Sequence, residues 1–333
     1  MDLLILGGTQ WLGRELAAAA VARGHDVTCL ARGEAGAVAD GVRFVASDRS
    51  SPDAYAAVAG RAWDAVIDVT RVAAFAAEAA AALAGATRQA VFISTGNVYA
   101  RHDEPGADET AALLEPGTRA SDDDPYGTAK VACEAAYRAA YGDRLLVVRS
   151  GLIGGPGDHS GRTGYYVARA ARDDAPMLVP DLGDAAAQLI DVRDLVDWVL
   201  GSLERGLTGT FDAVGERNTV AGVVASSLEV AGRRGEVVAV PAAFLVEQGV
   251  AEWSGEDSMP LWIADASWSA FQAHSNAAAV AAGLRLRPLE ETLADLLAWE
   301  RAQGLDRARG AGLSAGRERD LVRAARDGAR LAT

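Results

Sequence analysis

The chain has 333 residues, of which 50% are apolar, so it is long enough for one large domain or for a domain with an additional lobe. Its net charge of −14 argues against nucleic acid and anionic membranes as partners. The only two cysteines, and the absence of any C-x-x-C motif or His/Cys cluster, predict neither a disulfide framework nor a metal site.

The expected environment of the chain is the cytoplasm. A strand is predicted from residue 2, which leaves no room for the basic and apolar regions of a signal peptide. No uninterrupted apolar run reaches about 18 residues, the length of a membrane-spanning helix. We therefore expect a soluble monomer or homodimer that acts on a small molecule.

In the first half of the chain, short apolar runs alternate with helical stretches. The runs that predict buried strands are 2–6, 26–30, 42–46, 65–69, 90–94 and 144–148. The stretches that predict helices include 14–24, 72–85 and 126–141. This alternation favours an α/β fold for residues 1–150, with a doubly wound parallel sheet covered by helices on both faces.

After about residue 150 the pattern loosens. A glycine-rich segment at 151–166 is followed by a predicted helix at 192–204 and by mixed short elements. Residues 151–300 are therefore predicted to form a smaller, substrate-binding lobe. Residues 301–333 are expected to form a helical tail with a packing role.

The turn between the first strand and the first helix reads GGTQWLG, residues 7–13. Glycines at such a turn allow backbone N–H groups to approach a pyrophosphate, which the helix N-terminus also attracts. The turn predicts a dinucleotide site, although a purely structural turn is the alternative. Its candidate cofactor-binding residues are Gly7, Thr9, Gln10, Trp11, Leu12 and Gly13.

The second predicted strand ends in CLARGE, residues 29–34. An acidic residue at this place would bind the adenosine ribose hydroxyls of NAD, but the chain has Ala31 and then Arg32. A cation without a carboxylate suits the 2′-phosphate of NADP. The alternative is that Arg32 is an ordinary surface arginine.

The only lysine of the chain, Lys130, follows Tyr126 by four positions in the predicted helix 126–141. Residues four apart share a helix face, so the phenol and the ammonium can reach one site. A nearby cation favours the phenolate and lowers a tyrosine pKa from its usual value of about 10. The alternative is an ordinary helix-surface pair.

Four segments together resemble the extended (atypical) short-chain dehydrogenase/reductase superfamily, which includes the NAD-dependent epimerases and dehydratases. They are GGTQWLG at 7–13, VIDVT at 66–70, FISTGNVYA at 92–100, and YGTAK at 126–130 with RSGLIGGPGD at 149–158. The last group contains the family's Y-x-x-x-K motif. The resemblance implies a Rossmann-type fold and an NAD(P)-dependent active site, and it is looser after residue 160.

The resemblance implies roles for individual residues. Tyr126 would be the general acid/base, and Lys130 would lower its pKa and bind the nicotinamide ribose. Thr95 would hydrogen-bond the substrate oxygen, and Ser94 is its rival for that role. Two further positions that match cofactor contacts are Val69, at a strand end beneath the nicotinamide ribose, and Asp48, near the adenine.

The chain also departs from the family pattern. Gln10 replaces the middle glycine of the turn, and the H-L-A-A and N-x-x-G-T segments of nucleotide-sugar enzymes are missing. These differences weaken the case for sugar-nucleotide epimerisation. Several side chains fall near the expected cleft, where the tyrosines could equally be packing residues: His102, His159, Arg162, Tyr165 and Tyr166.

The function expected from the sequence is that of an NADP-preferring oxidoreductase with a Thr-Tyr-Lys site, with NAD as a further option. One alternative is an NAD-dependent epimerase or dehydratase that acts on a sugar-like substrate. A second alternative, from another class, is a non-catalytic dinucleotide-sensing regulator. RNA binding is disfavoured by the net charge.

Overall fold

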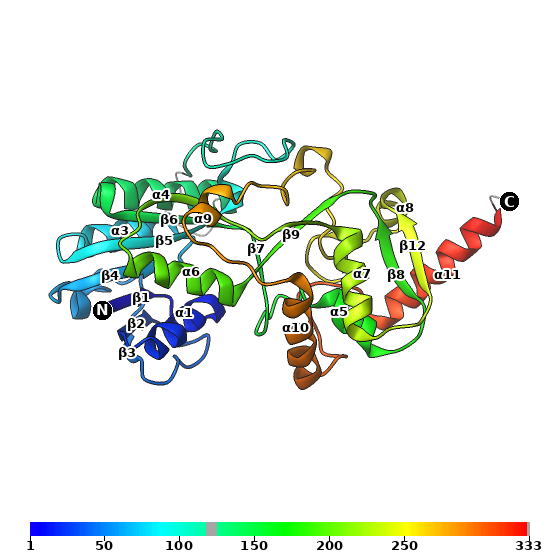
Figure 1. Cartoon of the computed structure of the whole chain (residues 1–333), viewed down its shortest axis with the longest axis horizontal. Coiled ribbons are helices and arrows are strands. Elements are labelled where there is room, and N and C mark those ends of the chain that lie inside the picture. The colour runs from blue at the N-terminus through cyan, green and yellow to red at the C-terminus, as the bar shows by residue number, and fades with distance from the viewer. Residues whose placement is uncertain (118–124, 332–333) are drawn as a thin grey trace.

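The computed structural model describes residues 1–117 and 125–331 (Figure 1). Its strands are β1 (Asp2–Leu6), β2 (Asp26–Ala31), β3 (Arg43–Ala46), β4 (Trp63–Asp68), β5 (Thr87–Thr95), β6 (Leu145–Ser150), β7 (Leu152–Gly154), β8 (Met177–Asp181), β9 (Ala186–Asp191), β10 (Gly209–Ala213), β11 (Arg217–Thr219), β12 (Val237–Pro241), β13 (Ala251–Glu252) and β14 (Ser258–Met259).

The helices come from the same two ranges. They are α1 (Trp11–Ala22), α2 (Ala56–Ala59), α3 (Ala73–Leu83), α4 (Tyr126–Tyr141), α5 (Tyr165–Arg172), α6 (Val192–Glu204), α7 (Val220–Ala231), α8 (Ala242–Glu247), α9 (Ala277–Ala281), α10 (Leu289–Gln303) and α11 (Ala315–Leu331), with 3-10 turns η1 (Gly96–Val98), η2 (Gly142–Arg144) and η3 (Ala266–Trp268).

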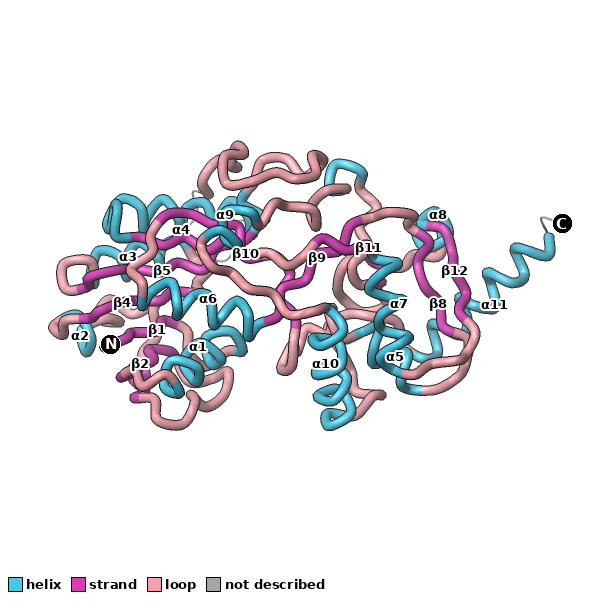
Figure 2. Tube along the Cα trace, viewed as in Figure 1, coloured by secondary structure: helices cyan, strands magenta, loops and turns pink. Residues whose placement is uncertain are grey.

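A parallel sheet forms the centre of the larger part of the molecule. In the described chain it has seven strands in the order β10-β6-β5-β4-β1-β2-β3, and every neighbouring pair is parallel. Helices α1 and α6 pack on one face, and α3 and α4 pack on the other (Figure 2). Both faces are therefore buried, which explains why the strands are near-continuous apolar runs. The predicted doubly wound α/β fold is confirmed.

The smaller part of the molecule is built by segments after residue 150. β7 and β11 flank β9 in one short sheet, β8 pairs with β12 in another, and helices α5, α7, α10 and α11 surround them. Two elements from the same stretch of sequence instead belong to the larger part of the molecule. β10 is an edge strand of the large sheet, and α6 packs on a face of that sheet. The spatial division between the two parts therefore does not fall at one position in the chain, and the boundaries at 150 and 300 stay predictions.

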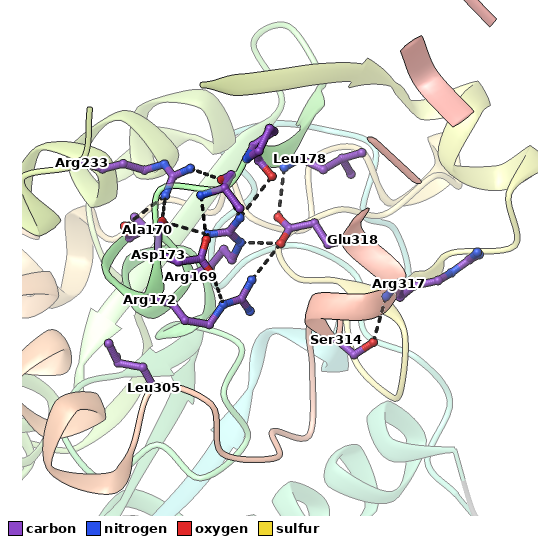
Figure 3. Close-up of polar contacts among 12 residues, drawn as sticks. Arg169, Ala170, Arg172, Asp173, Leu178, Arg233, Leu305, Ser314, Arg317 and Glu318 are labelled. Atoms are coloured by element: carbon purple, nitrogen blue, oxygen red, sulfur yellow. Dashed lines mark hydrogen bonds and ion pairs between the residues drawn. The ribbon is translucent and has the colours of Figure 1, made fainter. Parts of the chain in front are cut away.

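The first turn of α11 is fixed to this smaller part by a buried carboxylate (Figure 3). Glu318 is 2% exposed and accepts hydrogen bonds from Arg169 and Arg172 of α5 and, at 3.0 Å, from the backbone N–H of Leu178 in β8. Leu321 and Val322 of the same helix are buried in the core of this part, and only the C-terminal end of α11 extends away from the molecule (Figure 1). The predicted helical tail thus has a packing contact at its beginning.

Candidate active site

Two cavities lie beside the carboxyl ends of the central strands, and Tyr126 lines both of them. The smaller cavity, about 590 Å³, is bordered by the glycine turn, the ends of β2 and β4, and Lys130. The larger cavity, about 880 Å³, lies between the end of β5 and the smaller part of the molecule. A ligand site at the carboxyl ends of the strands is the usual arrangement in open α/β sheets.

The glycine turn brings backbone close to the smaller cavity. Gly7 has a φ of +102°, which few other residues adopt, and a Cβ on Gly13 would lie 2.3 Å from the Gly7 carbonyl oxygen. Helix α1 can therefore start directly against β1, with Thr9 and Gln10 lining the cavity.

The next two residues of the turn, Trp11 and Leu12, do not line the smaller cavity. Leu12, the second residue of α1, packs against the hydrophobic core. The Trp11 ring lines the larger cavity, and its Nε1 donates to the Pro156 carbonyl at 3.0 Å. The Trp11 side chain thus links the turn to the loop that follows β7.

The far end of the smaller cavity is polar. Arg32 and Asp48 both line it, and Arg32 is mostly exposed. Hydrogen bonds from the backbone and side chain of Ser50 hold the pKa of the Asp48 carboxyl below its usual value. Glu34 also lines this end, with its carboxylate 3.3 Å from the Arg32 guanidinium. The cation predicted for a 2′-phosphate therefore has a competing carboxylate beside it.

A buried ion pair forms the floor of the smaller cavity. Arg49 binds both carboxylate oxygens of Asp68 at 2.7–2.8 Å, and its guanidinium lies near the rings of Tyr55 and Phe75. Tyr137 of α4 donates to the same carboxylate at 2.7 Å. Through the Asp68 carboxylate, these contacts connect the end of β4 to α4, the helix that carries Tyr126 and Lys130.

Tyr126 and Lys130 occupy the first turns of α4, where Tyr126 is 42% exposed and Lys130 is 3% exposed. The Lys130 Nζ donates to the Ile93 carbonyl at 2.6 Å and lies 3.5 Å from the Val69 carbonyl. Its ammonium also lies 4.9 Å from the centre of the Phe92 ring. Lys130 is therefore not a surface cation, and it is held between the ends of β4 and β5 at the wall of the smaller cavity.

Ser94 and Thr95 point to opposite sides of β5. Thr95 lines the larger cavity, and its hydroxyl donates to Asn97 at 3.0 Å. Ser94 is 2% exposed and donates to the Glu134 carboxylate at 2.6 Å. Of the two candidate hydroxyls, only Thr95 faces the larger cavity.

Sequence reasoning missed a buried polar network behind Thr95. Glu134 forms a two-pronged ion pair with Arg149, which also donates to Tyr99, and Tyr99 donates to Asp212 at 2.7 Å. His274 stacks on the Tyr99 ring at 5.0 Å and lines the larger cavity. Glu134 could have been found from the sequence, because it lies four positions after Lys130 on the same helix face.

Two groups of this network have shifted pKa values. Burial raises the pKa of Asp212 to about 7, with the charge of Glu109 acting in the same direction and the Tyr99 hydrogen bond opposing it. Burial lowers the pKa of His274 to about 4. At neutral pH His274 is therefore a neutral imidazole.

Replacing Asp212 by asparagine is expected to stabilise the protein at about pH 8 but not at about pH 5. The folded-state pKa of Asp212 is about 7 and the usual value is 3.8, so its stabilising contribution is complete below 3.8 and is lost as the pH rises through 7. Above that pH the buried charge costs up to about 4 kcal/mol at 1.36 kcal/mol per pKa unit. Urea unfolding at both pH values measures the change.

His274 gives this prediction a second signature. Because its folded pKa is lowered, stability from His274 rises with pH between about 4 and 6.5, opposite to the effect of Asp212. The two effects partly cancel in the parent protein, so the Asp212→Asn variant should gain stability steeply over that window. An equal change in the free energy of unfolding at both pH values would contradict the assignment.

The smaller part of the molecule supplies the outer wall of the larger cavity. Its lining includes Trp253, Trp268 and Phe271, together with His159 and Arg162 from the loop after β7. Tyr165 and Tyr166 are instead buried in the core of that part, as the packing alternative expected. His102 is also buried, stacked on Trp268 at 4.3 Å. No sequence motif marks Trp253, which follows β13, or Trp268, which lies in the 3-10 turn η3.

Within residues 1–117 and 125–331, no cluster of three or more His, Cys, Asp or Glu side chains could hold a metal ion. None of the helices in these ranges is long and apolar enough to cross a membrane.

Comparisons with known proteins concern the sequence and the fold. The model of the NAD dependent epimerase/dehydratase family matches residues 75–213. A curated relative, the 2'-dehydrokanamycin reductase of Streptomyces kanamyceticus, is 34% identical over 206 residues, which cover 58% of this chain and 55% of the relative. The chain thus matches only about half the length of that relative.

Solved structures share the fold over nearly the whole chain. A Burkholderia cenocepacia J2315 protein named as a candidate epimerase has a TM-score of 0.72 at 22% identity, covering 90% of this chain and 98% of its own. The UDP-glucuronic acid 4-epimerase of Bacillus cereus, solved with NAD, has a TM-score of 0.66 at 13% identity, covering 91% and 99%. Residues 75–213 therefore match the NAD dependent epimerase/dehydratase family, and the chain shares the fold of these solved structures over nearly its whole length.

Proposed function

We propose that the protein is an NADP-preferring oxidoreductase that interconverts a carbonyl and an alcohol on a small molecule. The observation that supports this most directly is the position of Tyr126, which lines the smaller and the larger cavity at once. A proton carrier at the junction of a dinucleotide site and a substrate site is what carbonyl reduction requires.

The residues of the smaller cavity fit a dinucleotide. A Cβ at Gly7 would come within 2.8 Å of the Val69 side chain, so this wall is formed by bare backbone, and the start of α1 lies beside it. Thr9, Gln10 and Lys130 offer polar groups along the same wall. When bound, a reduced nicotinamide dinucleotide supplies the hydride that a carbonyl carbon accepts.

The chain's own residues handle the proton and the developing charge. Tyr126 would donate its phenolic proton to the carbonyl oxygen during reduction and take it back during oxidation. The Lys130 ammonium would stabilise the phenolate that remains after donation. Thr95, facing the larger cavity, would donate a hydrogen bond to the same substrate oxygen.

The curated relative is named a reductase, which supports carbonyl reduction over epimerisation. Native mass spectrometry of the purified protein tests this choice. An exchangeable dinucleotide site, together with consumption of NADPH in the presence of ketones, supports the reductase. NAD that stays tightly bound through purification would favour an epimerase or dehydratase, which regenerates its cofactor in each cycle. Dinucleotide binding without any hydride transfer would favour the regulator.

Arg32 is the proposed source of the NADP preference. If its guanidinium meets the 2′-phosphate, NADPH should bind more tightly than NADH by about 1–3 kcal/mol, the range of a charge-assisted hydrogen bond. Arg32→Ala should remove most of that difference and leave NADH affinity nearly unchanged. Titration calorimetry with both dinucleotides measures the two affinities.

Glu34 provides a matched control on the same cavity wall. Its carboxylate lies 3.3 Å from the Arg32 guanidinium, so a 2′-phosphate must displace it. Glu34→Gln should therefore strengthen NADPH binding while NADH binding changes little. Equal affinities of the parent protein for NADPH and NADH would refute the role of Arg32.

A further inference from the structure

Among the described residues that line the larger cavity, Arg162 is the only lysine or arginine. His274, which also lines the cavity, does not replace it as a cation, because burial lowers the pKa of His274 to about 4. An arginine stays charged in proteins, so Arg162 brings a fixed positive charge to the cavity wall. Burial lowers the pKa of the Arg162 guanidinium, and the charges of Asp158 and then Tyr126 act in the opposite direction.

The protein holds the Arg162 side chain at its Nε and leaves its terminal nitrogens free. The Nε donates to the Ser160 hydroxyl at 3.2 Å, and that hydroxyl donates in turn to the Asp158 carboxylate at 2.6 Å. Within the described residues, no hydrogen bond joins the two terminal nitrogens of Arg162 to an acceptor, and no carboxylate lies within ion-pair distance of them. The N–H groups suited to two-pronged binding are thus unused.

The indole of Trp253 supports the guanidinium from one side, with the Arg162 Cζ 5.4 Å from its ring centre. Trp253 has a φ of +64°, a conformation that a bulky residue rarely adopts. Its backbone N–H is held by the carbonyls of Met259 and Trp262 at 3.2 and 3.1 Å. The indole also contacts the Phe271 ring edge to face, so the Arg162 guanidinium lies beside an aromatic pair.

Although the charge of Asp158 acts on Arg162, none of the described carboxylates that line the cavity forms an ion pair with it. Both oxygens of Asp158 accept hydrogen bonds from the backbone and hydroxyl groups of Ser160 and Thr163. Glu252 accepts from the backbone of Ala264, and Asp265 is bonded within its own turn. The structure thus presents an oriented guanidinium next to an aromatic wall, with its free edge available to a ligand.

We propose that Arg162 binds an anionic group, a carboxylate or a phosphate, on a ring-containing substrate whose reacting carbon lies at Tyr126. The aromatic wall would stack on the ring, and the guanidinium would bind the anion in a two-pronged manner. The inference rests on the proposed function in taking the larger cavity as the substrate site.

Benzoate, phenyl phosphate and the neutral isostere benzamide test this proposal by calorimetry on the NADPH-saturated protein. Benzoate or phenyl phosphate should bind about tenfold to a hundredfold more tightly than benzamide, the range of a charge-assisted hydrogen bond. Preference for benzoate identifies a carboxylate site, and preference for phenyl phosphate identifies a phosphate site. Arg162→Gln should abolish the advantage over benzamide, and Arg162→Lys should keep part of it.

Arg285→Gln is the matched control, because Arg285 bonds main-chain oxygens of its own segment and does not line the cavity. It should retain the full preference for the anion. Equal binding of benzamide and both anions, no binding of either anion, or an unchanged preference in Arg162→Gln would overturn the anion site. NADPH affinity is measured in parallel for each variant. If the parent protein does not bind NADPH, the proposed function is contradicted instead. Failure of the anion site and failure of the proposed function are therefore distinguishable.

Discussion

Lys130→Arg is expected to slow hydride transfer by a factor on the order of 10²–10⁴, the contribution of general acid–base catalysis. The Lys130 ammonium fits between the carbonyls of Ile93 and Val69 and the face of the Phe92 ring. A guanidinium is wider and directs its N–H groups in a plane, so it cannot repeat these contacts in a site that is 3% exposed. It would move toward the smaller cavity or away from the phenol.

Tyr126→Phe separates the chemical effect from a packing effect. Tyr126 is 42% exposed and begins α4, so removing its hydroxyl should leave the free energy of unfolding nearly unchanged. Lys130→Arg enlarges a buried group and should cost roughly 1–3 kcal/mol of stability. Both variants should nevertheless lose turnover to a similar degree.

The double variant should be scarcely slower than either single variant, because residues that act as one unit are not additive. Single-turnover hydride transfer, followed by nicotinamide absorbance, measures the rates. Thermal melts and NADPH titrations of each variant serve as controls. A fully active Lys130→Arg variant would remove the catalytic role of the pair and would favour the dinucleotide-sensing alternative.

The central sheet and the helix of the Tyr126–Lys130 pair were predictable because their signals are local. Helix α4 spans Tyr126–Tyr141 as predicted, and Pro125 directly before it marks its start. Helix α6 also has its predicted bounds, and Asp191 caps it by accepting from the Arg193 backbone at 2.9 Å. A proline before α4 and a capping aspartate before α6 are local signals, which do not depend on distant contacts.

The outer wall of the larger cavity could not be predicted in the same way. Trp253 follows a two-residue strand, Trp268 lies in a 3-10 turn, and His274 lies in a coil segment. No periodicity places such residues, and their positions depend on contacts with distant segments, such as the stacking of His274 on Tyr99. The outer wall of the larger cavity was therefore the part of the molecule that could not be predicted from the sequence.

The choice between Ser94 and Thr95 was also beyond sequence reasoning. Adjacent residues of a strand face opposite sides of the sheet, so a shift of one position exchanges their environments. The structure directs Thr95 to the larger cavity and Ser94 to the buried Glu134. Glu134 and its partner Arg149 come from α4 and β6, and only their meeting in space identifies the side of the sheet that Ser94 faces.

Glu318→Gln is expected to lower the free energy of unfolding by about 3 kcal/mol, the lower part of the range for breaking a buried ion pair. The neutral amide would leave the guanidinium of Arg169, which is 3% exposed, without its buried counter-charge (Figure 3). Arg169 would keep the partly exposed Asp173 at 3.2 Å and the carbonyl oxygen of Ala175 at 3.0 Å, which limits the loss.

Asp320→Asn on the same helix is the matched control. Asp320 pairs with Arg323 at the surface, where both side chains are more than half exposed, and such pairs contribute about 0–1 kcal/mol. Urea unfolding of the two variants, monitored by the far-UV signal and by tryptophan fluorescence, measures the difference. Glu318 lines neither cavity, so NADPH affinity below the unfolding transition should not change. If Glu318→Gln is no more destabilising than Asp320→Asn, the buried carboxylate is not what holds α11 against α5 and β8.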